Sequence, residues 1–222
     1  MTDFHYFEQP SDTSSGTLNP VFELLDYPIV MGGADDIVLT GPTPDRPMVD
    51  GREVTDPRLI KALAKPDELD RAEVLDRSAK FAGVLRAMGI TGGDGERILI
   101  AEDVPPISRA LSILGAVRIG LSIDVRSEPA GDSTSVFVHP IEAPPVESGR
   151  ASVKAIRSRF EGVGIAIAGE TANLDQAMRD SRVEPTEVVA LTPDQTLIHT
   201  DEKSLDARSS LEWLSREIFA EA

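Results

Sequence analysis

The spacing of apolar positions predicts one long helix in the first half of the chain. Between residues 74 and 88, five positions recur at intervals of 4, 3, 4 and 3 residues, which places them on one face of a helix. They are Val74, Ser78, Phe81, Leu85 and Met88. The acids that follow Pro66 suit the first turn of a helix, and Gly89 suits its end. The pattern therefore predicts a helix over 66–88.

The next apolar run predicts a βαβ unit. Residues 97–101 (Arg-Ile-Leu-Ile-Ala) are almost continuously apolar, which is typical of a central parallel strand covered on both faces. A helical pattern over 107–119 and a strand pattern over 121–125 follow. Two strands joined by a helix of this length are expected to pair in parallel with a right-handed crossover.

Weaker signals in the rest of the chain continue this alternation. The expected elements are a short helix or turn over 21–25, strands over 36–40, 135–138, 164–168, 187–191 and 196–199, and helices over 152–160, 174–179 and 206–220. Residues 41–57, with four prolines, are expected to form a loop with at most a short edge strand around 48–49. Strands that alternate with helices predict an α/β fold, with a mostly parallel sheet and helices on both faces. Residues 1–35 are interpreted as a polar N-terminal segment and residues 36–222 as a single α/β domain.

Charge and composition narrow the class of partner. The chain has 22 Lys and Arg against 38 Asp and Glu, a net charge of −16, which disfavours nucleic acid and membrane surfaces as partners. The absence of cysteine and the wide separation of the three histidines give no metal-ligand pattern, so no metal site is expected. The N-terminus lacks the pattern of a secretory signal and no run of residues suits a membrane span, so a cytoplasmic protein is expected.

Four polar residues are candidates for a ligand-binding site because they lie at the ends of predicted strands. Glu102 and Asp103 follow the first strand of the βαβ unit, Asp124 lies near the end of its second strand, and His139 follows a later strand. The carboxyl ends of parallel strands are where α/β folds bind ligands, and paired carboxylates can transfer protons. The alternative is that the acids are solvated loop residues and that the histidine is structural.

Two glycine-containing segments could be mistaken for phosphate-binding loops. Residues 13–17 (Thr-Ser-Ser-Gly-Thr) have no strand before them and no lysine after them. Residues 91–95 (Thr-Gly-Gly-Asp-Gly) connect a helix to a strand, whereas a phosphate loop connects a strand to a helix. Both segments are therefore interpreted as turns, the second with glycine at a positive φ.

Three segments between residues 78 and 120 combine a helix that ends in glycine, a Gly-Asp turn before an apolar strand, and a helix that ends in Arg-Ile-Gly. They are Ser78–Ile90, Gly93-Asp94 with Arg97–Ile100, and Ala116–Gly120. Together they resemble the N-terminal portion of AMP-forming acyl-CoA synthetases, above all acetyl- and propionyl-CoA synthetases. Shorter likenesses occur at 16–19, 25–26, 174–178 and 187–191. The resemblance implies a fold but no chemistry, and the turn over 93–97 is longer than the family's Gly-Asp-Arg turn.

The resemblance also implies where an ATP-binding loop should lie, and the sequence departs from the family there. Members hold the ATP phosphates with a loop rich in Ser, Thr and Gly that ends in Lys, expected just after residues 192–194 (Thr-Pro-Asp). Residues 195–203 contain no glycine, and Asp201 and Glu202 would repel a triphosphate. The sequence also ends at Ala222, before the family's adenine-contacting motifs and the domain with its catalytic lysine. No cofactor and no catalytic residue is therefore expected.

Three hypotheses about function follow. The first is a non-catalytic binding or regulatory module with an acyl-CoA synthetase-like fold, and the second is a component of a split AMP-forming synthetase completed by a separate chain. The third is an unrelated small-molecule enzyme at the carboxyl edge of the sheet. A small-molecule ligand, a protein partner and a homodimer are all compatible with the sequence. The C-terminal helix, with Leu211, Trp213, Leu214 and Ile218, is expected to cover the apolar face that the rest of a synthetase would cover.

Overall fold

The structure of the chain is a computed structural model that describes residues 4–42, 48–49, 52–53, 55–63, 66–93, 95–126, 134–142, 158–180 and 183–219. The N-terminal elements are η1 (Phe22–Asp26, a π-helical segment), α1 (Tyr27–Val30), β1 (Ile37–Thr40), β2 (Met48–Val49), β3 (Arg52–Glu53), α2 (Pro57–Leu63) and β4 (Glu68–Asp70). Two small antiparallel pairs, β1 with β4 and β2 with β3, are separate from the main sheet. Within the loop expected over 41–57, residues 48–49 form the short strand β2, which pairs with β3.

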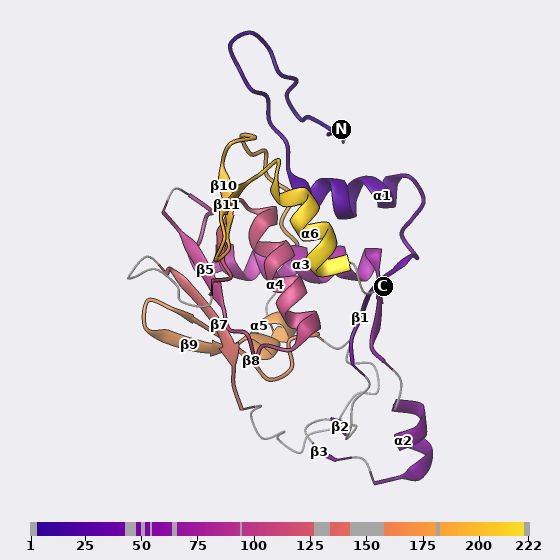
Figure 1. Cartoon of the computed structure of the whole chain (residues 1–222). Coiled ribbons are helices and arrows are strands. Elements are labelled where there is room, and N and C mark those ends of the chain that lie inside the picture. The colour runs from indigo at the N-terminus through magenta and orange to yellow at the C-terminus, as the bar shows by residue number, and fades with distance from the viewer. Residues whose placement is uncertain are drawn as a thin grey trace.

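The remaining elements build the main sheet and its helices (Figure 1). They are α3 (Arg71–Ala87), β5 (Arg97–Ile100), α4 (Pro106–Arg118), β6 (Ser122–Asp124), β7 (Val136–Pro140), β8 (Val163–Ile167), β9 (Glu170–Asn173), α5 (Leu174–Asp180), β10 (Thr196–His199), β11 (Ser204–Asp206) and α6 (Ser210–Phe219). The strand order is β11-β10-β6-β5-β7-β8-β9. The four central strands β10, β6, β5 and β7 are parallel, and the outer strands are antiparallel to their neighbours. The predicted α/β class and the central parallel position of β5 are confirmed.

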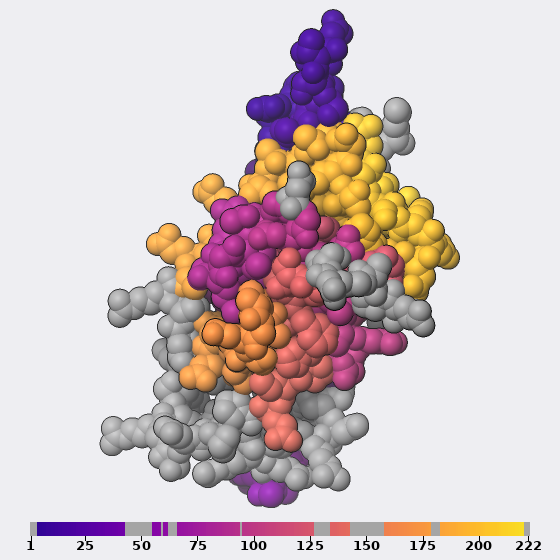
Figure 2. Space-filling model, turned by 90° about the vertical axis from the view of Figure 1, so that its left-hand side faces the viewer, coloured from indigo at the N-terminus to yellow at the C-terminus, as the bar shows by residue number. Residues whose placement is uncertain are grey.

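Helices cover one face of this sheet. Ile98 and Ile100 of β5 point into the core, where α4 packs on β5 and β6, α5 packs on β8, and α3 packs on α4. Leu99 is only partly buried, and its register neighbour Phe137 keeps 36% of its surface exposed. In the described part of the chain no helix packs on that second face, which we call the open face, and residues of β7, β8 and β9 reach the surface there (Figure 2).

Among the described residues, the helices expected on both faces of the sheet are found on one face. An apolar run such as residues 97–101 shows that a strand is buried, but it does not show that both of its faces are covered equally. The helix expected over 152–160 falls largely outside the described residues, and its described part, residues 158–160, is not helical.

The long helix starts five residues later than its apolar pattern predicts. Residues 68–70 form β4, which pairs with β1, and α3 begins at Arg71. Asp70 is extended and its side chain accepts a hydrogen bond of 2.7 Å from the Glu73 amide, so it caps the helix. The acids after Pro66 therefore belong to a strand and a cap. The helix stops where expected, because Gly89 has a φ of +89°.

Close packing between α3 and α4 requires a glycine. A Cβ atom added to Gly115 would lie 2.5 Å from the Ser78 carbonyl oxygen and 2.8 Å from the Phe81 ring. Phe81 is fully buried and stacks on Phe160, with 5.5 Å between the ring centroids. The small residue lets the two helices approach until these rings fill the space between them and the sheet.

The two C-terminal predictions need correction. The strand expected over 187–191 is absent: the Val189 amide donates to the Arg118 carbonyl, and Leu191 makes only an isolated bridge with Leu18. The C-terminal helix is shorter than expected, and α6 packs on η1 and β1 with Leu214 and Ile218 buried. Because α6 packs there, the described structure does not show it covering the open face.

A buried polar cluster joins four short segments that are distant in the sequence. Arg118 is 4% exposed and donates to both carboxylate oxygens of Asp26, at 2.8 and 2.9 Å, and to the Thr186 carbonyl at 2.7 Å. The fully buried Asn19 amide donates to the Val189 carbonyl at 2.9 Å and to the Arg118 carbonyl at 3.3 Å. The likenesses at 16–19, 25–26, 116–120 and 187–191 are therefore parts of one structural site.

Replacing Ile98 by alanine is expected to lower the free energy of unfolding by about 2–5 kcal/mol, because it leaves a cavity in the buried core. Replacing the adjacent Leu99 by alanine removes a side chain that water already reaches, so the expected loss is less than about half as large. Urea unfolding of the two variants measures the difference. Equal losses would show that both faces of β5 are buried alike.

Candidate ligand-binding site

The four residues proposed from the sequence do not form one group. Glu102 and Asp103 are exposed in the loop between β5 and α4, and Asp124 is 1% exposed at the end of β6. His139 lies within β7, not after it. Its Nδ1 atom is 2.9 Å from the Pro140 carbonyl oxygen, and its ring stacks on Phe137. Of the four, only Glu102 lines a cavity at the carboxyl edge.

A cavity of about 370 Å³ lies at the carboxyl ends of β5 and β6. Leu99, Ala101 and Phe137 give it an apolar wall, and Glu102, Arg109 and Arg126 bring charges to it. A second cavity of about 360 Å³ extends over the open face towards Ala166 and shares Leu99 and Phe137 with the first. We call the first the carboxyl-edge cavity. Its position agrees with the usual place of ligands in open α/β sheets.

Asp124 is held as an anion by arginines. Arg126 Nε donates to Asp124 Oδ1 at 2.8 Å, a second guanidinium nitrogen of Arg126 contacts Oδ2, and Arg97 lies 3.5 Å from Oδ2. The hydrogen bond from Arg126 lowers the pKa of Asp124 despite the burial of this carboxyl group. Asp124 is therefore ionised and fully engaged near neutral pH, which does not suit a proton-transfer role.

His199 lies beside Asp124 in the parallel register of β10 and β6. Its Nδ1 atom is 3.0 Å from the Ser204 hydroxyl. Burial lowers the pKa of His199, and the charges of Arg97 and Arg126 lower it further. The imidazole is therefore neutral near pH 7 and supports the β10–β11 hairpin.

The sequence reasoning missed the cations of this region. It examined acids and histidines at the ends of strands, whereas the charges around the carboxyl-edge cavity include Arg109 and Arg126. Arg126 directly follows the strand expected over 121–125, so the same strand-end argument, applied to basic residues, would have found it. Arg109 lies one turn into α4, and only the three-dimensional contact of that helix with β5 brings it to the cavity.

The side-chain carboxylate of Glu96 occupies the glycine-rich turn that begins at Thr91. Glu96 accepts hydrogen bonds from the backbone amides of Thr91, Gly92 and Gly93 at 2.9, 2.8 and 3.1 Å. Partial burial raises the pKa of Glu96, but these three amides outweigh it and leave the pKa lowered. The donors that a phosphate would need are thus occupied, which agrees with the interpretation of this segment as a turn.

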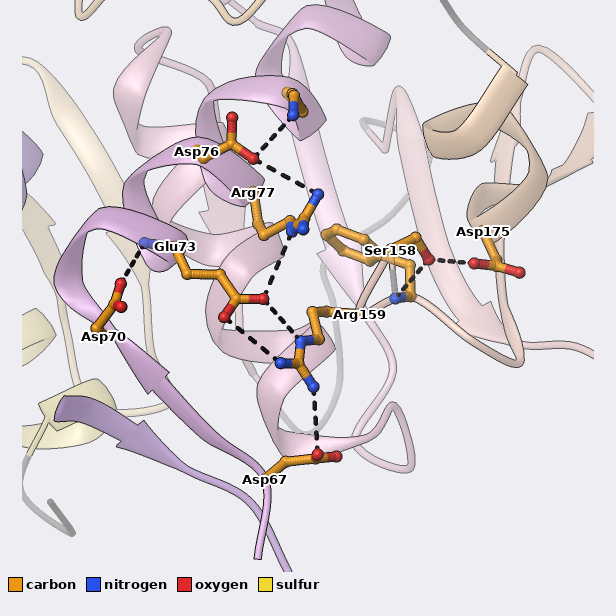
Figure 3. A network of polar contacts seen from close by, with 10 residues as sticks. Asp67, Asp70, Glu73, Asp76, Arg77, Ser158, Arg159 and Asp175 are labelled. Carbon is orange, nitrogen blue, oxygen red and sulfur yellow. Dashed lines mark hydrogen bonds and ion pairs between the residues drawn. The ribbon is translucent and has the colours of Figure 1, made fainter. Parts of the chain in front are cut away.

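A second network of charged and polar side chains holds the residues around Arg159 in place (Figure 3). Arg159 Nε donates to Glu73 at 2.9 Å and another of its nitrogens donates to Asp67 at 3.2 Å. The neighbouring Ser158 hydroxyl donates to Asp175. These contacts join the residue before β4, helix α3 and helix α5 through residues 158–159, and every charge named here has a partner. We interpret the network as structural.

The connection between β10 and β11 is a tight turn over residues 200–203. The Thr200 amide and hydroxyl both donate to the Lys203 carbonyl, at 3.0 and 2.8 Å, and the Lys203 amide donates to the Thr200 hydroxyl at 3.1 Å. Asp201 and Glu202 are exposed at its tip. The turn therefore exposes two carboxylates at its tip. The backbone amides of Thr200 and Lys203 donate to atoms within the turn.

The described residues hold neither a metal-ligand cluster nor a membrane-spanning helix. Within those residues no group of three or more His, Asp or Glu side chains is arranged to hold a metal ion. No helix among them is long and apolar enough to cross a membrane.

The comparisons with known proteins give a structural likeness alone. No protein-family profile matches the chain, and no curated protein matches it in sequence. Among solved structures, the crystal structure of an acyl-CoA synthetase from Brucella canis matches with a TM-score of 0.51 and 14% identity, over 89% of this chain and 35% of that chain. The likeness confirms the predicted relation to acyl-CoA synthetases at the level of the fold. This chain spans about a third of the length of that synthetase chain.

The lowered pKa of Glu96 predicts a pH-dependent contribution to stability. That contribution is complete above the ordinary glutamate pKa of about 4.3 and is lost as the pH falls through the lowered pKa of the folded state. Glu96→Gln is therefore expected to be less stable than the wild type at neutral pH, with a difference that shrinks below about pH 4. Urea unfolding at several pH values measures it, with Glu212→Gln on α6 as the exposed control. A difference that stays constant with pH would contradict the prediction.

Proposed function

We propose that this chain is a non-catalytic binding module with an acyl-CoA synthetase-like fold, which holds a small molecule at the carboxyl edge of its sheet and does not adenylate acids by itself. The turn between β10 and β11 carries this proposal. It lies where the resemblance to the synthetases implies an ATP-phosphate loop, after residues 192–194.

The chemistry of that turn disfavours a triphosphate. A phosphate loop offers several free backbone amides, usually from glycines, towards the anion. Here the amides of Thr200 and Lys203 are bonded within the turn, and the exposed carboxylates of Asp201 and Glu202 repel phosphate. The other glycine-rich candidate is filled by Glu96. These contacts support a scaffold that has no ATP-phosphate site in its described residues.

The open face favours a second candidate, a component of a split AMP-forming synthetase. Phe137 and Leu99 present apolar surface there, and a separate chain could cover it and supply an adenylating site. The two candidates differ in a mixing experiment: a split enzyme gains acid-dependent pyrophosphate release when the second chain is added. A binding module shows no pyrophosphate release in the same mixture.

The proposal predicts that ATP with Mg²⁺ leaves the melting temperature of the purified chain unchanged. A ligand present at 100 times its dissociation constant stabilises the folded state by about 2.7 kcal/mol, which would raise the melting temperature by roughly 5–10 °C in a chain of this size. The chain is also expected to release no pyrophosphate with ATP and a short carboxylic acid. An active acyl-CoA synthetase serves as the positive control for the assay. Acid-dependent pyrophosphate release by the chain alone would overturn the proposal.

A further inference from the structure

Arg109 is a partly buried cation without an ion pair among the described residues. One of its terminal nitrogens donates to the carbonyl oxygens of Ile100 and Ala101, at 3.1 Å each, and its remaining N–H groups have no acceptor in the described protein. Burial lowers the pKa of Arg109, and the charge of Glu102 offsets this only in part. The residue also lies near the N-terminus of α4, where the helix dipole disfavours a positive charge.

The remaining donors of Arg109 face the carboxyl-edge cavity, since none of its nitrogen atoms is both buried and without a hydrogen-bond partner. A partly buried arginine is normally paired with a carboxylate, because burial disfavours a charge that has no partner. Arg118, at the other end of the same helix, is paired in this way: it donates two hydrogen bonds to the carboxylate of Asp26. Arg109 has unused donors and lines the carboxyl-edge cavity of about 370 Å³.

The rest of the cavity defines the shape and charge of its ligand. Arg126 contributes a second cation, but it is largely neutralised by Asp124. Glu102, at the same cavity, disfavours a ligand with several negative charges. Leu99 and Phe137 form an apolar wall that continues into the neighbouring cavity. One negative charge joined to a flat apolar body fits these surroundings best.

We propose that the carboxyl-edge cavity binds a small organic monoanion whose oxygen atoms accept hydrogen bonds from Arg109 and whose apolar part lies on Leu99 and Phe137. The inference rests on the proposed function, because it names the ligand class of the same binding module. Arg109 is the residue that holds the charge. Phe137 is the residue that selects an aromatic or otherwise flat body.

The test is a binding titration with benzenesulfonate, a monoanion that contains no acyl group and cannot be adenylated. It is expected to bind the wild type and to raise its melting temperature, whereas benzamide, which has the same ring without the charge, and inorganic sulfate, which lacks the ring, are expected to bind at least ten-fold more weakly. Arg109→Met is expected to lose at least ten-fold in affinity. Arg216→Met, which removes an exposed arginine on α6, is the matched control and is expected to bind like the wild type.

Two further variants keep the test decisive. If Arg109→Met does not fold, Arg109→Gln takes its place, because an amide can still donate to the carbonyls of Ile100 and Ala101. Phe137→Ala removes the exposed ring and is expected to weaken benzenesulfonate while leaving the response to sulfate unchanged. Absence of benzenesulfonate binding, or equal binding by the Arg109 variants and the wild type, would overturn the inference. Pyrophosphate release with ATP would instead overturn the non-catalytic function, so the two failures are distinguishable.

Discussion

The fold depends on the buried guanidinium of Arg118. Its hydrogen bonds to Asp26 and to the Thr186 carbonyl tie the C-terminal end of α4 to η1 and to the irregular segment before β10. Breaking a buried pair of this kind leaves an uncompensated charge and costs about 3–5 kcal/mol, so three distant parts of the chain are held as one unit. The segments that resemble acyl-CoA synthetases meet here, and the structural likeness to the Brucella canis enzyme covers most of the chain. What the comparison shows between this chain and that synthetase is a likeness of fold.

The same helix connects the scaffold to the candidate site. α4 is fixed at its C-terminal end by Arg118, and its first turn brings Arg109 to the carboxyl-edge cavity. The close approach of α3 at Gly115 limits movement of α4 between these two ends. The hydrogen bonds of Arg109 to the Ile100 and Ala101 carbonyls hold its guanidinium at the end of β5, where it has no ion pair among the described residues. The open face beside it leaves Leu99 and Phe137 accessible.

Sequence reasoning predicted the central elements well because their signals are local. The apolar stripe of α3, the apolar run of β5 and the glycine that ends α3 depend on neighbours in the chain. The sequence-based predictions were wrong where a contact with residues far away in the chain determines the secondary structure. Residues 68–70 form a strand because β1 pairs with them, and residues 187–191 stay irregular because Arg118 and Leu18 take their backbone hydrogen bonds. Sequence reasoning chose acids and a histidine at strand ends, whereas the carboxyl-edge cavity is also lined by Arg109, and the position of Arg109 follows from the packing of α4 on β5.

The central claim is that this synthetase-like scaffold binds a ligand at the carboxyl edge without an ATP-phosphate site at the β10–β11 turn. Mapping of backbone amide chemical shifts by NMR tests both halves in one sample, titrated first with ATP and Mg²⁺ and then with benzenesulfonate. The account predicts no response of residues 199–204 to ATP, and benzenesulfonate shifts centred on Leu99, Ala101, Arg109 and Phe137. Shifts at residues 199–204 with ATP, together with an unchanged carboxyl edge in benzenesulfonate, would contradict it.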